Sequence, residues 1–159
     1  MRPRIALEVS LSPQIPVGSW QARHVRDEDA EDLATLLYAA FRGTVDDEGE
    51  TFADAMAEVE NLLAGAYGRF LPDCSFVVED GEFLVSASLV SWFEQHEAPL
   101  LAFTMTRPEA QRRGLARFLL QHSINALQSA GFARLTLIVT EANTTARRLY
   151  ESLGFRSMV

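Results

Sequence analysis

The stretch QRRGLARFLLQ, residues 111–121, places two arginines and a glycine where one sequence pattern gives way to another. The preceding segment, Leu100–Thr106, is almost continuously apolar, which is typical of a strand covered on both faces. From Leu115 onward apolar residues recur at helical spacing. Gly114 therefore lies at a strand-to-helix turn. A helix begins with unpaired N–H donors, so this turn is either a polar loop capped by glycine or a binding site for a phosphate.

Two common phosphate-binding motifs do not fit this turn. The P-loop ends in Gly-Lys-Ser/Thr, whereas residues 114–116 read Gly-Leu-Ala. The dinucleotide-binding fingerprint requires three glycines, and the stretch contains only Gly114. If the turn binds a phosphate, it does so within another fold.

The remaining sequence predicts further strands and helices in one domain, residues 1–159. Apolar and β-branched runs bounded by turn residues predict strands. They cover Arg4–Ser10, Trp20–Val25, two segments that form a hairpin around Asp80-Gly81 within residues 74–93, Leu100–Thr106, and residues 134–139. The last two should be parallel, because a helix connects them.

Apolar stripes at helical spacing and capping residues predict the helices. They cover residues 26–41 with Ala30, Leu33, Leu37 and Phe41 on one face, a helix from its N-cap Thr51 to near Gly68 or Pro72, a helix from Leu115 to Gly131, and a helix from its N-cap Asn143 to Gly154. The fold class is therefore α/β or α+β, a mixed central sheet flanked by helices.

Composition limits the kind of partner. The chain has 159 residues, of which 48% are hydrophobic, and a formal net charge of −8. An acidic chain of this kind is a poor partner for nucleic acid or an anionic membrane. Cys74 is the only cysteine, and the three histidines show no metal-ligand spacing, so we expect neither a disulfide nor a metal. The sequence shows no secretory signal pattern and no apolar run long enough to span a bilayer, so a cytoplasmic location is expected.

The turn matches a more specific pattern. Gln111, Gly114 and Ala116 fit Gln/Arg-x-x-Gly-x-Gly/Ala, with Pro108 and Glu109 at the usual spacing before them. The stretch resembles the pyrophosphate loop of the GNAT superfamily of N-acetyltransferases, which hold acetyl-coenzyme A (acetyl-CoA) there through backbone amides. This resemblance implies a cofactor-binding set made of Gln111, Arg112, Arg113, Gly114, Leu115 and Ala116. Arg112 departs from the pattern, since many relatives carry glycine at this position.

A second motif lies on the last predicted helix. NTTARRLYESLGF, Asn143–Phe155, resembles the GNAT motif Asn-x-x-Ala-x-x-Leu-Tyr-x-x-x-Gly-Phe, so the recognisable part of the chain spans about Leu100–Phe155. The resemblance implies that Asn143 reaches the pantetheine arm of the cofactor. It also implies that the backbone of Thr104, Met105 and Thr106 runs beside that arm.

Tyr150 permits two interpretations. Its helical position places it on the apolar face with Ala146, Leu149 and Leu153, so it can be a core tyrosine whose hydroxyl bonds a backbone carbonyl. The resemblance implies instead that Tyr150 is the general acid that protonates the departing CoA thiolate.

The general base is not identified. GNAT members often place a glutamate on the strand before the pyrophosphate loop, but Leu100–Thr106 contains no carboxylate. Glu94, His96 and Glu97 in the preceding turn are candidates, and a solvated base or no base is an alternative. The acidic segment with Asp46, Asp47, Glu48 and Glu50 either steers a cationic amine or is only a solvated loop.

The C-terminus is shorter than the family pattern. GNAT chains usually carry one or two strands after the Gly-Phe motif, whereas here only Arg156–Val159 follow. A shortened C-terminal strand region leaves a sheet edge, and such an edge invites pairing. Either Arg4–Ser10 or a partner chain in a homodimer is expected to complete it.

The sequence therefore predicts a GNAT fold and an acetyl-CoA-dependent N-acetyltransferase without a metal. The acceptor would be a primary amine on a small molecule or a peptide, and it would attack the thioester directly. The alternative is a non-catalytic module of GNAT shape that binds acyl-CoA or docks a partner.

Overall fold

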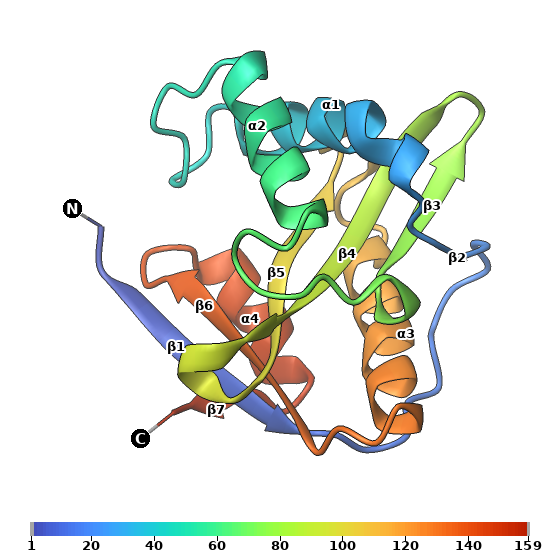
Figure 1. Cartoon of the computed structure of the whole chain (residues 1–159), viewed down its shortest axis with the longest axis vertical. Coiled ribbons are helices and arrows are strands. Elements are labelled where there is room, and N and C mark those ends of the chain that lie inside the picture. The colour runs from blue at the N-terminus through green and yellow to red at the C-terminus, as the bar shows by residue number, and fades with distance from the viewer. Residues whose placement is uncertain (1, 159) are drawn as a thin grey trace.

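The structure, a computed structural model, describes residues 2–158. These residues form a mixed sheet of seven strands in the order β2-β3-β4-β5-β6-β1-β7, flanked by four helices (Figure 1). The strands are β1 (Arg4–Ser10), β2 (Arg23–His24), β3 (Phe76–Asp80), β4 (Phe83–Phe93), β5 (Ala98–Thr106), β6 (Arg134–Thr140) and β7 (Arg156–Ser157). The helices are α1 (Ala30–Phe41), α2 (Phe52–Leu63), α3 (Leu115–Ser129) and α4 (Thr144–Ser152). The predicted fold class is confirmed.

The helices cover the two faces of the sheet in pairs. Leu89 of β4 packs in a buried cluster with α1 and α2, while its neighbour Val90 packs in a second cluster with α3 and α4. Because successive residues of a strand point to opposite faces, the two clusters lie on opposite sides of the sheet. The sheet therefore separates an α1–α2 side from an α3–α4 side.

The two central parallel strands part along their length. β5 carries one extra residue relative to β4, because Leu101 and Phe103 pair with the adjacent residues Val90 and Leu89. Only Leu100 of β5 pairs with β6. Beyond that point the strands diverge toward their carboxyl ends, as Figure 1 shows. This gap is the structural basis of the site.

The N-terminal strand fills the sheet edge next to β6. All seven residues of β1 pair antiparallel with β6, from Arg4 opposite Thr140 to Ser10 opposite Arg134. β7 then pairs with β1 on its outer side. Completion of the sheet by Arg4–Ser10 is thus confirmed, and the homodimer stays a prediction.

Three local expectations differ from the structure. α2 ends at Leu63, before Gly68, because Gly65 with φ +83° forms an earlier Schellman stop in which the Ala66 N–H donates to the Asn61 carbonyl. The segment Trp20–Val25 forms a strand only at Arg23–His24. β5 is not covered on both faces throughout, since its residues beyond Leu101, except Met105, are half-buried beside the gap.

Candidate active site

The turn between β5 and α3 has a fixed shape. A short 3-10 helix, Pro108–Ala110, follows β5, and the Gln111 side-chain amide donates to the Thr106 carbonyl at 3.1 Å. Arg112 has φ +66° and Gly114 has φ +87°, both in the left-handed region. Glycine adopts this region without steric cost, which explains why glycine is common at both positions in the family pattern.

The first turn of α3, like that of α1, lacks the side-chain cap that α2 and α4 have. Thr51 caps α2 and Asn143 caps α4, each through a side-chain oxygen that accepts a backbone N–H. Gly114, the N-cap of α3, has no side chain. The N–H donors of this first turn are therefore free of a side-chain cap, which is the condition for binding an anion.

A cavity of about 910 Å³ occupies the gap between β5 and β6. Thr104, Asn143 and Tyr150 line it, so the structure brings these three predicted residues together. The Thr104 hydroxyl oxygen is buried and has no hydrogen-bond partner within residues 2–158. A buried hydroxyl of this kind is costly unless it bonds a ligand or water. The lining thus holds a polar group suited to a ligand that enters between the strands.

The other predicted cofactor-binding residues lie outside this cavity. Met105 is buried against α1 and α2, and the Thr106 hydroxyl bonds Ser86 at 2.9 Å. Residues 111–116 form the turn and the start of α3 described above. Of the predicted cofactor-binding residues, Thr104 and Asn143 therefore line the cavity, whereas residues 111–116 form the turn after β5.

Tyr150 is buried with 6% of its surface exposed, and it borders the cavity. It belongs to the buried cluster with Leu153 and Phe155, and its hydroxyl makes no hydrogen bond within residues 2–158. Burial, and next the negative charge of Asp46, raises the pKa of Tyr150 above its usual range. The phenol is therefore fully protonated at neutral pH.

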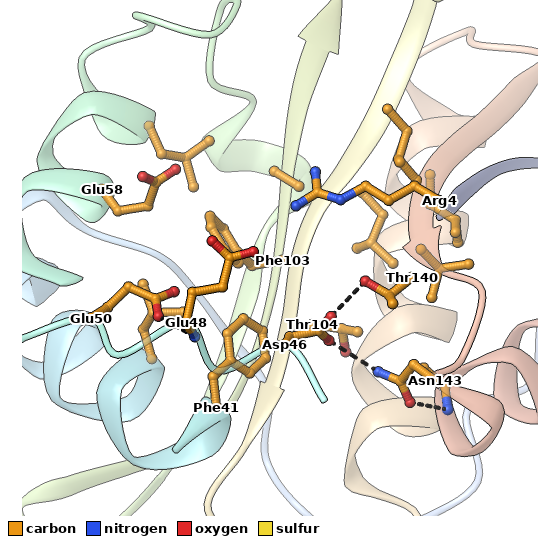
Figure 2. Close-up of a pocket in the computed structure, with 18 of the residues that line it drawn as sticks. Arg4, Phe41, Asp46, Glu48, Glu50, Glu58, Phe103, Thr104, Thr140 and Asn143 are labelled. Atoms are coloured by element: carbon orange, nitrogen blue, oxygen red, sulfur yellow. Dashed lines mark hydrogen bonds between the residues drawn. The ribbon is translucent and has the colours of Figure 1, made fainter. Parts of the chain in front are cut away.

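The acidic segment is not merely solvated. Asp46 reaches across the cavity mouth, where one carboxylate oxygen accepts from the Thr140 hydroxyl at 2.5 Å and the other from the Asn143 side-chain amide at 3.2 Å (Figure 2). The Asn143 side-chain oxygen meanwhile accepts from the Ala146 N–H. Sequence reasoning did not identify this contact, because it joins residues 97 positions apart.

Charged and aromatic residues complete the cavity walls. Figure 2 shows Glu48, Glu50 and Glu58 on the α1–α2 side, and Arg4 of β1 opposite them. In this view Phe103 lies between Glu58 and Arg4, and Phe41 lies below Glu48, with the two ring centroids 6.3 Å apart. Sequence reasoning missed Arg4 and Glu58. The sequence did hold one indication for Glu58: it directly precedes the buried Val59 on α2, so its position at the edge of the buried face could have been predicted.

The predicted candidates for a general base do not line the cavity. Glu94, His96 and Glu97 lie in the turn before β5, and Glu94 accepts from the Trp92 indole N–H at 2.8 Å. His96 bonds the Thr136 hydroxyl at 2.8 Å, and burial, followed by the charge of Arg134, lowers its pKa. Glu94 thus bonds β4 and His96 bonds β6.

The structure also bears on membranes, metals and the cysteine. Among residues 2–158, no helix is long and apolar enough to cross a membrane. In the same part of the chain, no group of three or more His, Cys, Asp or Glu side chains is arranged to hold a metal ion. Cys74 is buried, and burial raises its pKa, so the less reactive thiol form is favoured.

Comparison with known proteins identifies the domain. A family model described as the acetyltransferase (GNAT) family matches residues 19–155. Over 48 residues the chain is 52% identical to ribosomal protein bS18-alanine N-acetyltransferase of Salmonella typhimurium. That match spans 30% of this chain and 32% of the relative, so it covers about a third of each.

Solved structures share the fold at low sequence identity. A GCN5-related N-acetyltransferase from Sphaerobacter thermophilus superposes with a TM-score of 0.74 at 19% identity, over 99% of this chain and 49% of the other. An aminoglycoside N-acetyltransferase in complex with CoA gives 0.66 at 16% identity, over 92% and 94% of the two chains. At such identities the likeness establishes the fold alone.

Proposed function

The chain belongs to the acetyltransferase (GNAT) family, and from that premise we propose that it transfers an acetyl group from acetyl-CoA to a primary amine. The observation that carries the proposal is the Tyr150 phenol, which is buried, lacks a partner within residues 2–158 and borders the gap between β5 and β6. A phenol that borders the cavity and makes no hydrogen bond to protein is free to donate its proton to a ligand bound there, which supports the proposal.

Acetyl-CoA would bind through two separate regions. The uncapped N–H groups at Gly114, Leu115 and Ala116 would hold the pyrophosphate, and Arg112 and Arg113 would add positive charge. The pantetheine arm would pass between the parted strands, beside the backbone of residues 104–106 and the Asn143 side chain. Support comes from the unpartnered Thr104 hydroxyl, which a polar group of that arm would satisfy.

The reaction is a direct acyl transfer. The neutral amine nitrogen attacks the thioester carbonyl carbon, and the carbon–sulfur bond breaks with its electron pair on sulfur. Tyr150 donates its proton to this thiolate, which a phenol can do because the two conjugate acids differ by only a few pKa units. The proton released by the amine goes to solvent in this proposal, since β5 carries no carboxylate and the predicted base candidates Glu94, His96 and Glu97 do not line the cavity.

A second candidate function is a non-catalytic module that binds acyl-CoA. The specific observation in its favour is the absence of a carboxylate on β5. The arrangement around Tyr150 has no role in that module, so we prefer the enzyme.

The test combines binding with turnover. Calorimetry with CoA measures affinity, and release of free thiol from acetyl-CoA measures transfer to a panel of primary amines. Tyr150→Phe should lower kcat by roughly 100-fold or more, because a general acid contributes that much, while CoA affinity changes less than about twofold. Equal turnover in the variant contradicts the acid role. CoA binding without thiol release for any amine supports the module.

A further inference from the structure

The cavity contains more charge than its internal contacts use. Six acidic side chains border it, and five of them are engaged within the protein. Asp46 accepts from Thr140 and Asn143, Asp47 from the Gly43 and Gly49 N–H groups, Glu48 pairs with Arg2, Glu50 accepts from the Glu48 N–H, and Asp54 accepts from the Thr51 N–H. Glu58 makes no hydrogen bond or ion pair within residues 2–158. It is the uncommitted anion of the cavity.

Three arginines border the cavity, and two of them have partners within the protein. Arg2 pairs with Glu48 and the Asp47 carbonyl, and Arg42 lies over the Tyr38 ring at 4.8 Å. Arg4 has no such partner within residues 2–158. Figure 2 shows its guanidinium directed from β1 into the cavity, opposite the acidic side chains of the α1–α2 side. It is the uncommitted cation.

Arg4 lies away from the turn that is proposed to bind the pyrophosphate. Arg4 pairs with Thr140 at the end of β6, whereas the turn at residues 107–114 follows β5. None of the residues 107–116 lines the cavity that Arg4 faces. Arg4 and the turn therefore serve different parts of the site.

We propose that the acceptor is a small molecule that carries a carboxylate as well as its amine. Glu58 attracts the ammonium group, and Arg4 binds the carboxylate through its planar pair of N–H donors. Phe103 lies between them, with Phe41 beside it, and the two rings contact the apolar part of the molecule. The acceptor shares the cavity of about 910 Å³ with the pantetheine arm. This inference rests on the proposed function and names its substrate class.

The experiment uses matched acceptors. 4-Aminobutyrate, 5-aminopentanoate and 6-aminohexanoate are each compared with the corresponding amide, which keeps the amine and removes the negative charge. For the best chain length, kcat/KM of the wild-type protein should favour the carboxylate by about tenfold or more, the usual value of a charged bidentate contact. Arg4→Gln should reduce this preference to near one without changing CoA affinity, and Arg4→Lys should restore part of it. Glu58→Gln should lower kcat/KM for both members of a pair.

Two control variants remove the same chemical groups outside the cavity. Arg156→Gln changes a residue of the exposed strand β7, and Glu60→Gln changes a residue of α2 two positions from Glu58. Both should keep the wild-type preference. An unchanged preference in Arg4→Gln, or a loss of CoA affinity in that variant, overturns the proposal.

A binding measurement separates this inference from the proposed function. The same acceptor pairs are titrated into the CoA-loaded protein by calorimetry. If no amine is acetylated but the carboxylate member binds more tightly through Arg4, the proposed activity fails and the ligand class stands. If neither member binds, or both bind equally, the ligand class is wrong.

Discussion

Asp46 and Asn143 are joined across the mouth of the cavity by a hydrogen bond of 3.2 Å, although Asp46 lies in the α1–α2 loop and Asn143 caps α4, 97 positions along the chain. The same carboxylate accepts from Thr140 at 2.5 Å. Asp46 thus ties the α1–α2 loop to the end of β6 and the start of α4. Its negative charge also contributes to the raised pKa of Tyr150.

Asp46→Ala should loosen this loop. The variant loses two hydrogen bonds to a charged acceptor, and because the site is partly solvated we expect a cost of about 1 kcal/mol in local opening. Amide hydrogen exchange over residues 43–51 should therefore accelerate about fivefold. Glu48→Gln, an exposed change in the same loop, is the control and should leave exchange there within about twofold. Equal exchange in the Asp46 variant and the wild type contradicts the tie.

Gly114→Ala should weaken CoA binding. A Cβ at φ +87° costs about 1–2 kcal/mol and also adds bulk beside the first N–H groups of α3. Gly131→Ala is the matched control, because it has φ +93° with open space around it at the other end of the same helix. Urea unfolding should show similar destabilisation for both variants. Calorimetry should show at least about tenfold weaker CoA binding for Gly114→Ala only. Equal CoA affinity in the two variants would mean that the turn does not bind the cofactor.

The raised pKa of Tyr150 predicts a loss of stability at alkaline pH. The unfolded chain releases the phenol proton near pH 10, while the folded chain retains it, so the contribution is complete below pH ~10 and is lost as pH rises further. The loss approaches about 1.4 kcal/mol per pH unit. The sequence contains no lysine, so few other groups titrate there. Urea unfolding between pH 8 and 11 should show a smaller alkaline loss for Tyr150→Phe than for the wild type or for Tyr67→Phe, an exposed control; equal slopes contradict the assignment.

The lowered pKa of Asp29 predicts a loss of stability at acid pH. It is 4% exposed, and burial alone raises its pKa, but the bidentate bonds from Arg23 at 2.8 Å and the Arg26 N–H lower it overall. Its contribution is therefore present above pH ~3.9 and is lost as pH falls through the lower folded value. Asp29→Ala should lower the free energy of unfolding by about 3 kcal/mol at pH 7, because Arg23 then keeps Glu79 as its only charged partner.

Urea unfolding at pH 7, 5 and 3.5 checks the Asp29 prediction. The difference between wild type and Asp29→Ala should shrink at the lowest pH. Asp27→Ala, an exposed change in the same 3-10 turn, should stay within about 0.5 kcal/mol of the wild type. A difference that does not depend on pH would mean that packing, and not the charge, is lost.

The part of the fold that the sequence predicted depends on local chemistry. The caps Thr51 and Asn143 and the stops at Gly131 and Gly154 were read correctly, because each involves hydrogen bonds between residues a few positions apart. The stop at Gly65 was equally local and was missed, because the apolar repeat of α2 continues to Tyr67. Local signals also located the turn at Gly114 and placed Tyr150 on the buried face of its helix.

The tertiary structure alone decided what surrounds those motifs. Arg4 faces the cavity only because β1 pairs with β6 in a particular register, and a shift of one residue would turn its side chain to the opposite face. Asp46 meets Asn143, and Glu58 lies across from Arg4, because the order of the strands brings distant segments together. Short-range patterns carry no information on that order. The sequence thus determined the elements and the cofactor motifs, whereas the packing of the sheet decided which charges face the acceptor.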